Sequence, residues 1–90
     1  MAHYYAIAEH GLQGGWFLTV PGGAGYSFAL HAEEIVAEAQ DYLASVAMTG
    51  PLPRSVEDGA ALPTDLSDYE APAMVVVIPF ARSKEAKAAA

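Results

Sequence analysis

The order of apolar and polar residues predicts four short strands and one helix. Aromatic and β-branched residues gather in four stretches bounded by glycine or proline, as is typical of strands. These stretches are Tyr4–Glu9, Trp16–Val20, Tyr26–Ala29 and Met74–Phe80. Apolar side chains fall on both faces of the second stretch, so we expect that strand to be covered on both sides. The β-branched run of the fourth stretch is typical of a buried strand, and Pro79 marks either its end or a sheet edge.

The helix is the clearest element. From Ala32 onward, apolar residues recur at spacings of three and four, which forms a stripe wide enough to lie on a sheet. These residues are Ala32, Ile35, Val36, Ala39, Tyr42, Leu43 and Val46. Glu33 and Glu34 stand in the first turn, where the helix dipole favours anions, and His31 stands where a capping residue would be. Gly50 and Pro51 end the helix.

Residues 52–72 form a long excursion before the fourth strand. They contain scattered acids together with Pro53, Gly59, Pro63 and Pro72, which leaves room for at most a turn of helix. A connection of this length is uncommon in a compact domain, so we expect the segment either to be mobile or to pack against a partner.

The glycine-rich stretch before the third strand has two possible interpretations, a phosphate-binding loop or a turn. A phosphate-binding loop leads straight into a helix and is usually followed by Lys and then Ser or Thr. Here a strand separates the glycines from the helix, no lysine follows, and two glutamates occupy the turn that an anion would use. We therefore interpret the stretch as a structural turn, formed by Pro21, Gly22, Gly23 and Gly25.

Length and hydrophobicity predict a small domain that associates with itself. Ninety residues make one domain, and a hydrophobic fraction of 53% is high for so small a chain. We expect a homo-oligomer, a dimer or a tetramer. No apolar run is long enough to span a membrane, and the absence of cysteine fits the cytoplasm, so we expect a cytoplasmic protein without membrane contact.

The charge of the chain indicates the chemistry of its partner. The formal net charge is −7, and Arg54 is the only Lys or Arg in the first 80 residues. Such a domain is repelled by nucleic acid, and a basic protein is its natural partner. The alternative is that the negative surface simply keeps a hydrophobic protein in solution. Without interleaved cations, the aromatic residues indicate core and oligomer interface rather than base stacking: Tyr4, Tyr5, Trp16, Phe17, Tyr26 and Phe28.

The histidines give little support for catalysis. His31 with Glu33 and Glu34 could form an acid–base cluster or a metal site, but no His-x-x-x-His spacing exists. We interpret His31 as a residue of the helix start, and His3 and His10 as exposed histidines at the two ends of a strand.

A second acidic group lies late in the excursion. Asp65, Asp68 and Glu70 lack the glycine and the spacing of a calcium loop, so they indicate a solvated acidic loop. The sequence thus predicts no catalytic residue, no metal site and no cofactor.

One family resemblance covers about residues 3–80. The segments GGWFLTVPGGAG and HAEEIVAEAQDYLASVAMTGPLPR, in this order after an aromatic strand, resemble the HicB-like antitoxin family. Pro21 and Gly25 match the ends of that family's P-[DE]-x-P-G element, although Gly22 and Ala24 replace its acid and its second proline. The positions that match the helix and the proline segment after it are Glu33, Glu34, Ala39, Leu43, Leu52 and Pro53.

The resemblance implies an α+β domain of order β-β-β-α-β over residues 1–80. Its three- to four-stranded sheet would pack on one long helix, as in a truncated ribonuclease H fold without metal-binding carboxylates. Residues 81–90 would be a short charged tail, which we expect to be disordered. Since only this tail follows the fourth strand, we expect no DNA binding by this chain alone.

The resemblance also implies a function. Such a domain binds and neutralises a small basic HicA-type mRNA interferase toxin of a type II toxin–antitoxin system. The partner-binding residues we select are the acids of the helix, Glu33, Glu34, Glu38 and Asp41. The alternative is a stand-alone oligomeric domain with a regulatory or ligand-binding role and no cognate toxin.

Overall fold

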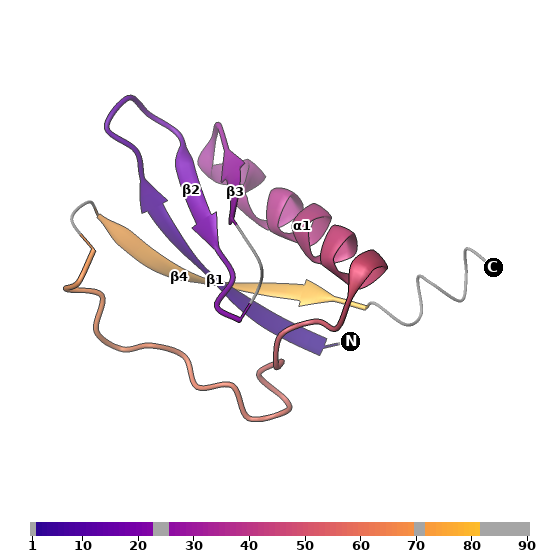
Figure 1. Ribbon diagram of the computed structural model, residues 1–90. Coiled ribbons are helices and arrows are strands. Elements are labelled where there is room, and N and C mark those ends of the chain that lie inside the picture. The colour runs from indigo at the N-terminus through magenta and orange to yellow at the C-terminus, as the bar shows by residue number, and fades with distance from the viewer. Residues whose placement is uncertain (1, 23–25, 70–71, 82–90) are drawn as a thin grey trace.

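A four-stranded antiparallel sheet with one helix packed on it forms the described part of the chain (Figure 1). The structure is a computed structural model that describes residues 2–22, 26–69 and 72–81. Its elements are β1 (Ala2–His10), β2 (Trp16–Thr19), β3 (Tyr26–Ala29), a 3-10 turn η1 (Ala32–Glu34), α1 (Ile35–Thr49) and β4 (Ala73–Phe80). The strands lie in the order β3-β2-β1-β4, and each neighbouring pair is antiparallel. The α+β class and the strand–helix order are therefore as predicted.

The observed boundaries differ from the predicted ones at the ends of elements. β1 is longer at both ends, because its first residues pair with β4, where Ala2 lies opposite Phe80, and His10 pairs with Trp16 of β2. The predicted single helix begins as the 3-10 turn η1 and becomes α-helical at Ile35. The Glu34 carboxylate accepts a hydrogen bond from the His31 backbone N–H at 3.2 Å, which satisfies a donor at the start of the helix.

The core lies between the sheet and α1. Alternate residues of each strand point toward the helix, as the two-residue period of a strand requires. The buried cluster consists of Tyr4, Ala6, Ala8, Leu18, Val20, Ala29, Ile35, Ala39, Leu43, Ile78 and Phe80. Alanines on β1, β3 and α1 are fully buried, so the helix can approach the strands closely. Tyr4 and Phe80 close one end of this core edge to face, with ring centroids 6.3 Å apart.

The prediction that β2 is covered on both sides is wrong. Leu18 is buried against α1, but on the other face Phe17 is 44% exposed and Thr19 is also exposed. The reason is that the single helix covers only one face of the sheet (Figure 1).

The prediction that the fourth strand is buried is also wrong. β4 lies at the edge of the sheet, where Val77 is 45% and Met74 39% exposed, and only Ile78 and Phe80 are buried. A run of β-branched residues fits any strand with apolar faces, so it does not distinguish an edge strand from a central one. Pro79 lies within this edge strand, which agrees with the edge interpretation of that proline.

The excursion runs on the side of the strands away from α1 (Figure 1). Among its described residues, 52–69 and 72, there are turns and a bend but no helix. Leu52 packs against the core, and Pro53 lies so close to Gly22 that a Cβ on this glycine would be 3.1 Å from the Cβ of Pro53. Residues 55–60, which we call the strap, close on themselves and contact β1 through His3.

Two sequence predictions lie partly or wholly outside the described residues. Pro21 and Gly22 are exposed after β2, and Gly22 has a φ of +87°, a backbone conformation that favours glycine; Gly23 and Gly25 are not described. The disorder predicted for the tail concerns residues 82–90, which are also outside the described part. No helix within the described ranges has both the length and the apolar character that crossing a bilayer requires.

Candidate functional site

The four predicted partner-binding acids lie on the solvent side of η1 and α1. Glu33, Glu34 and Asp41 are exposed, and Glu38 is partly buried. At about 100° per residue, Glu33, Glu34 and Asp41 lie away from the buried residues of the helix, and Glu38 lies at the border of the buried stripe. We call this set of four carboxylates the acidic helix face.

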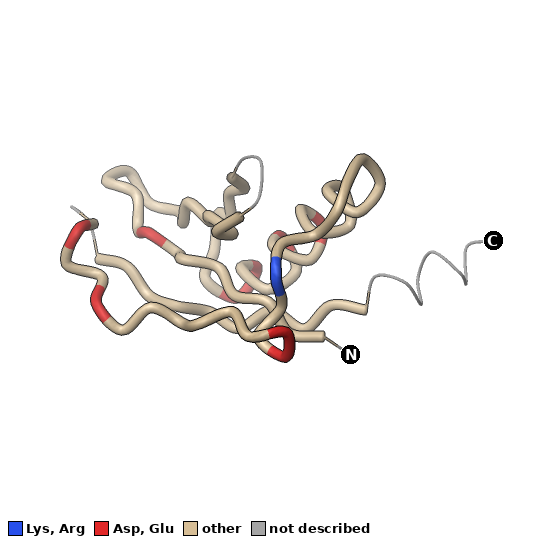
Figure 2. Tube along the Cα trace, turned by 60° about the horizontal axis from the view of Figure 1, so that its bottom comes forward, with Lys and Arg blue, Asp and Glu red and all other residues tan. Residues whose placement is uncertain are grey.

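The helix that carries the acidic helix face contains no basic residue. Neither η1 nor α1 contains Lys or Arg, and Arg54 is the only such residue in the described ranges (Figure 2). Of the four acids, Glu34 accepts the His31 N–H, and no hydrogen bond or ion pair is found within the described residues for Glu33, Glu38 and Asp41. Their charge is therefore not neutralised by contacts within this part of the fold.

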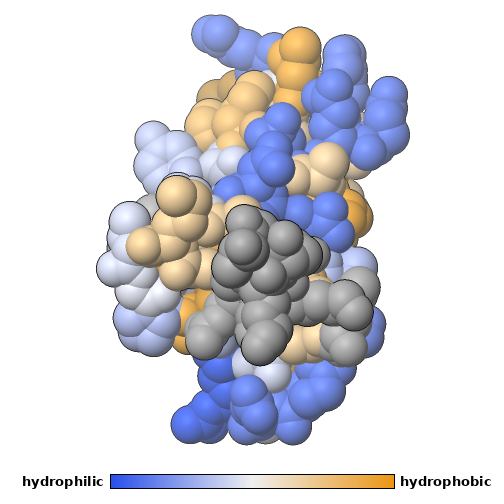
Figure 3. Space-filling view, turned by 90° about the vertical axis from the view of Figure 1, so that its right-hand side faces the viewer, coloured by the Kyte–Doolittle hydropathy of each residue, from blue (hydrophilic) through white to orange (hydrophobic). Residues whose placement is uncertain are grey.

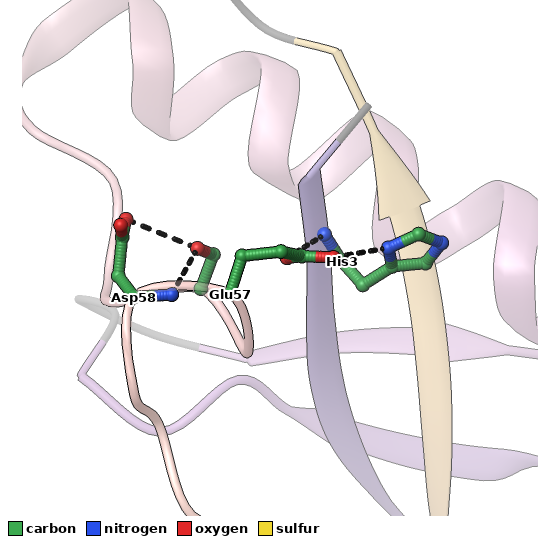
Figure 4. Close-up of polar contacts among 4 residues, drawn as sticks. His3, Glu57 and Asp58 are labelled. Carbon is green, nitrogen blue, oxygen red and sulfur yellow. Dashed lines mark hydrogen bonds and ion pairs between the residues drawn. The ribbon is translucent and has the colours of Figure 1, made fainter.

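Acids of the excursion differ because the fold uses several of them. The Glu57 carboxylate accepts the backbone N–H of His3 at 2.8 Å and lies 2.6 Å from the ring Nδ1 of His3 (Figure 4). Asp58 accepts the Ser55 hydroxyl at 3.0 Å, and Asp65 accepts the Ser67 N–H at 2.9 Å. These carboxylates hold the excursion in shape.

The hydrogen bonds to Glu57 change its acidity. Its pKa is lowered from 4.5 to about 2, chiefly by the backbone N–H of His3, then by the His3 ring and by the backbone N–H of Glu57 itself. The pKa of Asp65 is lowered by the backbone N–H and then by the side chain of Ser67. Both residues stay negative at neutral pH.

A second surface lies on the sheet face that α1 leaves open. Phe17, Tyr26 and Phe28 are 44%, 67% and 41% exposed, and Phe17 contacts both other rings edge to face at centroid distances of 6.3 and 5.3 Å. We call these three residues the aromatic patch. The patch needs a glycine at position 15, because a Cβ there would be 2.2 Å from Cζ of Phe28.

The aromatic residues divide between the core and the open sheet face. Tyr4 is in the core and Trp16 packs against it, as expected, whereas the patch residues lie outside the core, and their place in an oligomer interface stays a prediction. The end of the molecule at which α1 and β4 finish is different in character, since apolar and hydrophilic residues are interspersed over its described part (Figure 3). The exposed rings of the aromatic patch lie together on the open sheet face.

Two histidines have partners that the sequence did not reveal. His3 binds Glu57, which is 54 positions away in the chain. The ring centroids of His10 and Trp16 are 4.7 Å apart, and these two residues pair across β1 and β2. The hairpin register could have indicated the second contact, but no local signal could have indicated the first.

The residues considered for acid–base or metal chemistry do not form a cluster. Within the described ranges no three His, Asp or Glu side chains lie close enough together to hold a metal ion. His31 and Glu34 are joined by two hydrogen bonds of the helix start: the His31 backbone N–H donates to the Glu34 carboxylate at 3.2 Å, and the Glu34 backbone N–H donates to the His31 carbonyl at 3.0 Å. Glu70, the third acid of the loop with Asp65 and Asp68, is not among the described residues.

Comparison with known proteins gives no relative from which a function could be transferred. No family model, no curated protein and no solved structure matches this chain.

Proposed function

We propose that this chain is an antitoxin-like interaction protein that binds and neutralises a small basic protein, an mRNA interferase toxin of the HicA type in a type II toxin–antitoxin system. Two lines of argument support the proposal. The motifs around the glycine-rich turn and the helix resemble the HicB-like family in order and spacing. The α+β fold has the same order of elements that the resemblance implies.

The observation that carries the proposal is the acidic helix face. Three of its carboxylates, those of Glu33, Glu38 and Asp41, make no hydrogen bond or ion pair within the described residues. Glu33 and Asp41 are eight residues apart, so the four acids extend over about 12 Å of helix. A row of this length matches a cationic patch on a small protein and would speed its association.

The acidic helix face is a better candidate than the excursion. Glu57, Asp58 and Asp65 already accept hydrogen bonds from residues of their own segment or of β1, so a partner would have to compete with these contacts. A partner that binds the helix acids would have to compete with an existing hydrogen bond only at Glu34. We therefore assign partner binding to the helix.

The first test is whether a small basic protein is encoded next to this chain, and the second is to co-express the two. That protein alone should arrest growth, and the chain should restore growth and co-purify with the protein. Asp41→Lys should weaken rescue, whereas Asp68→Lys should not, because both acids are exposed but only Asp41 lies on the helix.

Several results would count against the proposal. If the neighbouring protein neither binds the chain nor is neutralised by it, the stand-alone domain with a regulatory or ligand-binding role becomes the better account. If rescue is lost with Asp68→Lys and kept with Asp41→Lys, the helix is not the binding surface.

A further inference from the structure

β4 has one side that is not paired. The strand is eight residues long and lies at the end of the strand order, with β1 on its only occupied side. The His10 N–H donates to the Pro72 carbonyl at 2.9 Å, which fixes the alternation of the ladder. Backbone groups of residues 74, 76, 78 and 80 therefore face β1, and those of residues 73, 75, 77 and 79 face away.

The outward backbone groups of Pro79 differ from those of the other outward residues of β4. Pro79 has no N–H, and its carbonyl accepts the side-chain amide of Gln40 at 2.8 Å. The outward N–H and C=O groups of Ala73, Val75 and Val77 have no hydrogen-bond partner within the described residues. Three consecutive outward residues thus offer three donors and three acceptors.

Little in the strand protects this edge from pairing. Natural edges are usually short, charged, bulged or interrupted by proline. β3, the other edge, is four residues long, but β4 has twice that length and contains no charged residue. Its proline lies beyond the three unpaired residues, and Val77 is 45% exposed.

We propose that β4 pairs with β4 of a second copy of this chain, antiparallel and across a two-fold axis at Val75. In this register Ala73 pairs with Val77 of the second copy, Val75 with Val75, and Val77 with Ala73. Every unpaired outward group of the three residues then finds a partner, and both sheets join into one of eight strands. The dimer forms independently of any toxin.

The second copy fits this edge because the strand is complementary to itself. A shift of the axis to residue 76 would place Ala73 opposite Pro79, which cannot donate. With the axis at Val75, Pro79 lies outside the paired residues in both copies, so its bond to Gln40 is kept. The absence of charge in β4 also matters. Each copy is acidic as a whole, and like charges placed opposite each other in paired strands would repel.

The mass of the full chain in solution, measured by sedimentation between about 1 and 100 µM, tests the proposal. We expect a dimer in which the amides of Ala73, Val75 and Val77 exchange slowly. Val75→Pro removes the central donor, and the monomer should tolerate it because that N–H is unused within the described residues. The dissociation constant should rise about tenfold or more, whereas Val75→Thr, which keeps the N–H, should change it much less.

A cysteine experiment tests the register itself. The chain contains no cysteine, so Val75→Cys introduces a single thiol. Hydrogen-bonded antiparallel residues lie roughly 5.5 Å apart at Cα, within the range that a disulfide spans. Oxidation should give a covalent dimer with Val75→Cys and far less with Ser45→Cys, on the exposed side of α1.

The proposal is overturned if the chain is monomeric at about 100 µM with rapidly exchanging amides at Ala73, Val75 and Val77, or if it dimerises equally well as folded Val75→Pro. Circular dichroism shows whether that variant is folded, and a Val75→Lys variant replaces it if it is not. Salt separates this interface from the proposed toxin contact, since screening should strengthen association between two acidic copies and weaken association with a basic protein.

Discussion

Glu57 joins the excursion to the first strand through a single residue, His3. One carboxylate oxygen accepts the His3 backbone N–H at 2.8 Å, and the other lies 2.6 Å from the His3 ring nitrogen. The neighbouring Val56 N–H donates to the His3 carbonyl at 2.7 Å, so His3 is held on both its backbone groups. The strap thereby occupies the part of β1 that β2 does not pair with.

Glu57→Gln should loosen the strap. Glutamine keeps one acceptor oxygen but loses the charge and the second acceptor, so the contacts to His3 weaken. We expect faster hydrogen exchange at the Val56 amide and little change in the amides of α1. Glu33→Gln is the matched control, since it removes an exposed carboxylate with no hydrogen bond in the described residues. Equal exchange at Val56 in both variants would contradict the role given to Glu57.

The same contact predicts a pH dependence of stability. Because the pKa of Glu57 is lowered from 4.5 to about 2 in the folded chain, its ionised form favours the folded state. This contribution is fully present above pH 4.5 and is lost as the pH falls toward 2. The difference in unfolding free energy between the native chain and Glu57→Gln should therefore shrink over this interval. A difference that stays constant from about pH 6 to about pH 2 would show that the charge of Glu57 contributes nothing.

Gly14 and Gly15 allow a test of the packing under the aromatic patch. Both have positive φ, +94° and +79°, so alanine is strained at either position. A Cβ at Gly14 meets nothing within 4 Å, whereas one at Gly15 collides with the Phe28 ring. Gly14→Ala should cost about 1 kcal/mol of unfolding free energy, and Gly15→Ala clearly more. Chemical denaturation measures both, and Phe28→Ala should remove most of the excess cost at Gly15.

Leu43→Ala should destabilise the chain strongly. The side chain is fully buried between α1 and the sheet, and its removal leaves a cavity. The expected loss is about 3 kcal/mol of unfolding free energy, a large part of the stability of so small a domain. Val36→Ala is the control, because Val36 lies on the same helix but is 37% exposed, and this variant should lose much less unfolding free energy. Similar losses for both would mean that the helix packs differently on the sheet.

The elements could be predicted from the sequence because their signals are local. The three-and-four spacing of the helix and the aromatic stretches of β1 to β3 depend only on near neighbours, and they place the acids of the acidic helix face on one side. The exposure of Phe17 depends on which face of the sheet the single helix covers. The edge position of β4 depends on pairing over the whole chain.

The contact between His3 and Glu57 also depends on the whole fold, so it could not have been predicted from the sequence. It joins residues 54 positions apart, and the segment that contains Glu57 has scattered prolines and acids but no apolar periodicity that would place it against β1. The helix acids could be located from their spacing alone, but their lack of partners within the described residues emerges only when the surrounding side chains are placed.

The decisive measurement is the association rate, at rising salt concentration, between this chain and the basic toxin proposed as its partner, to be sought in the adjacent reading frames. We expect a rate that falls steeply between about 0.05 and 0.5 M salt, and that is reduced about threefold or more by Asp41→Lys but not by Asp68→Lys. A rate that is independent of salt and equal in both variants would contradict binding through the acidic helix face.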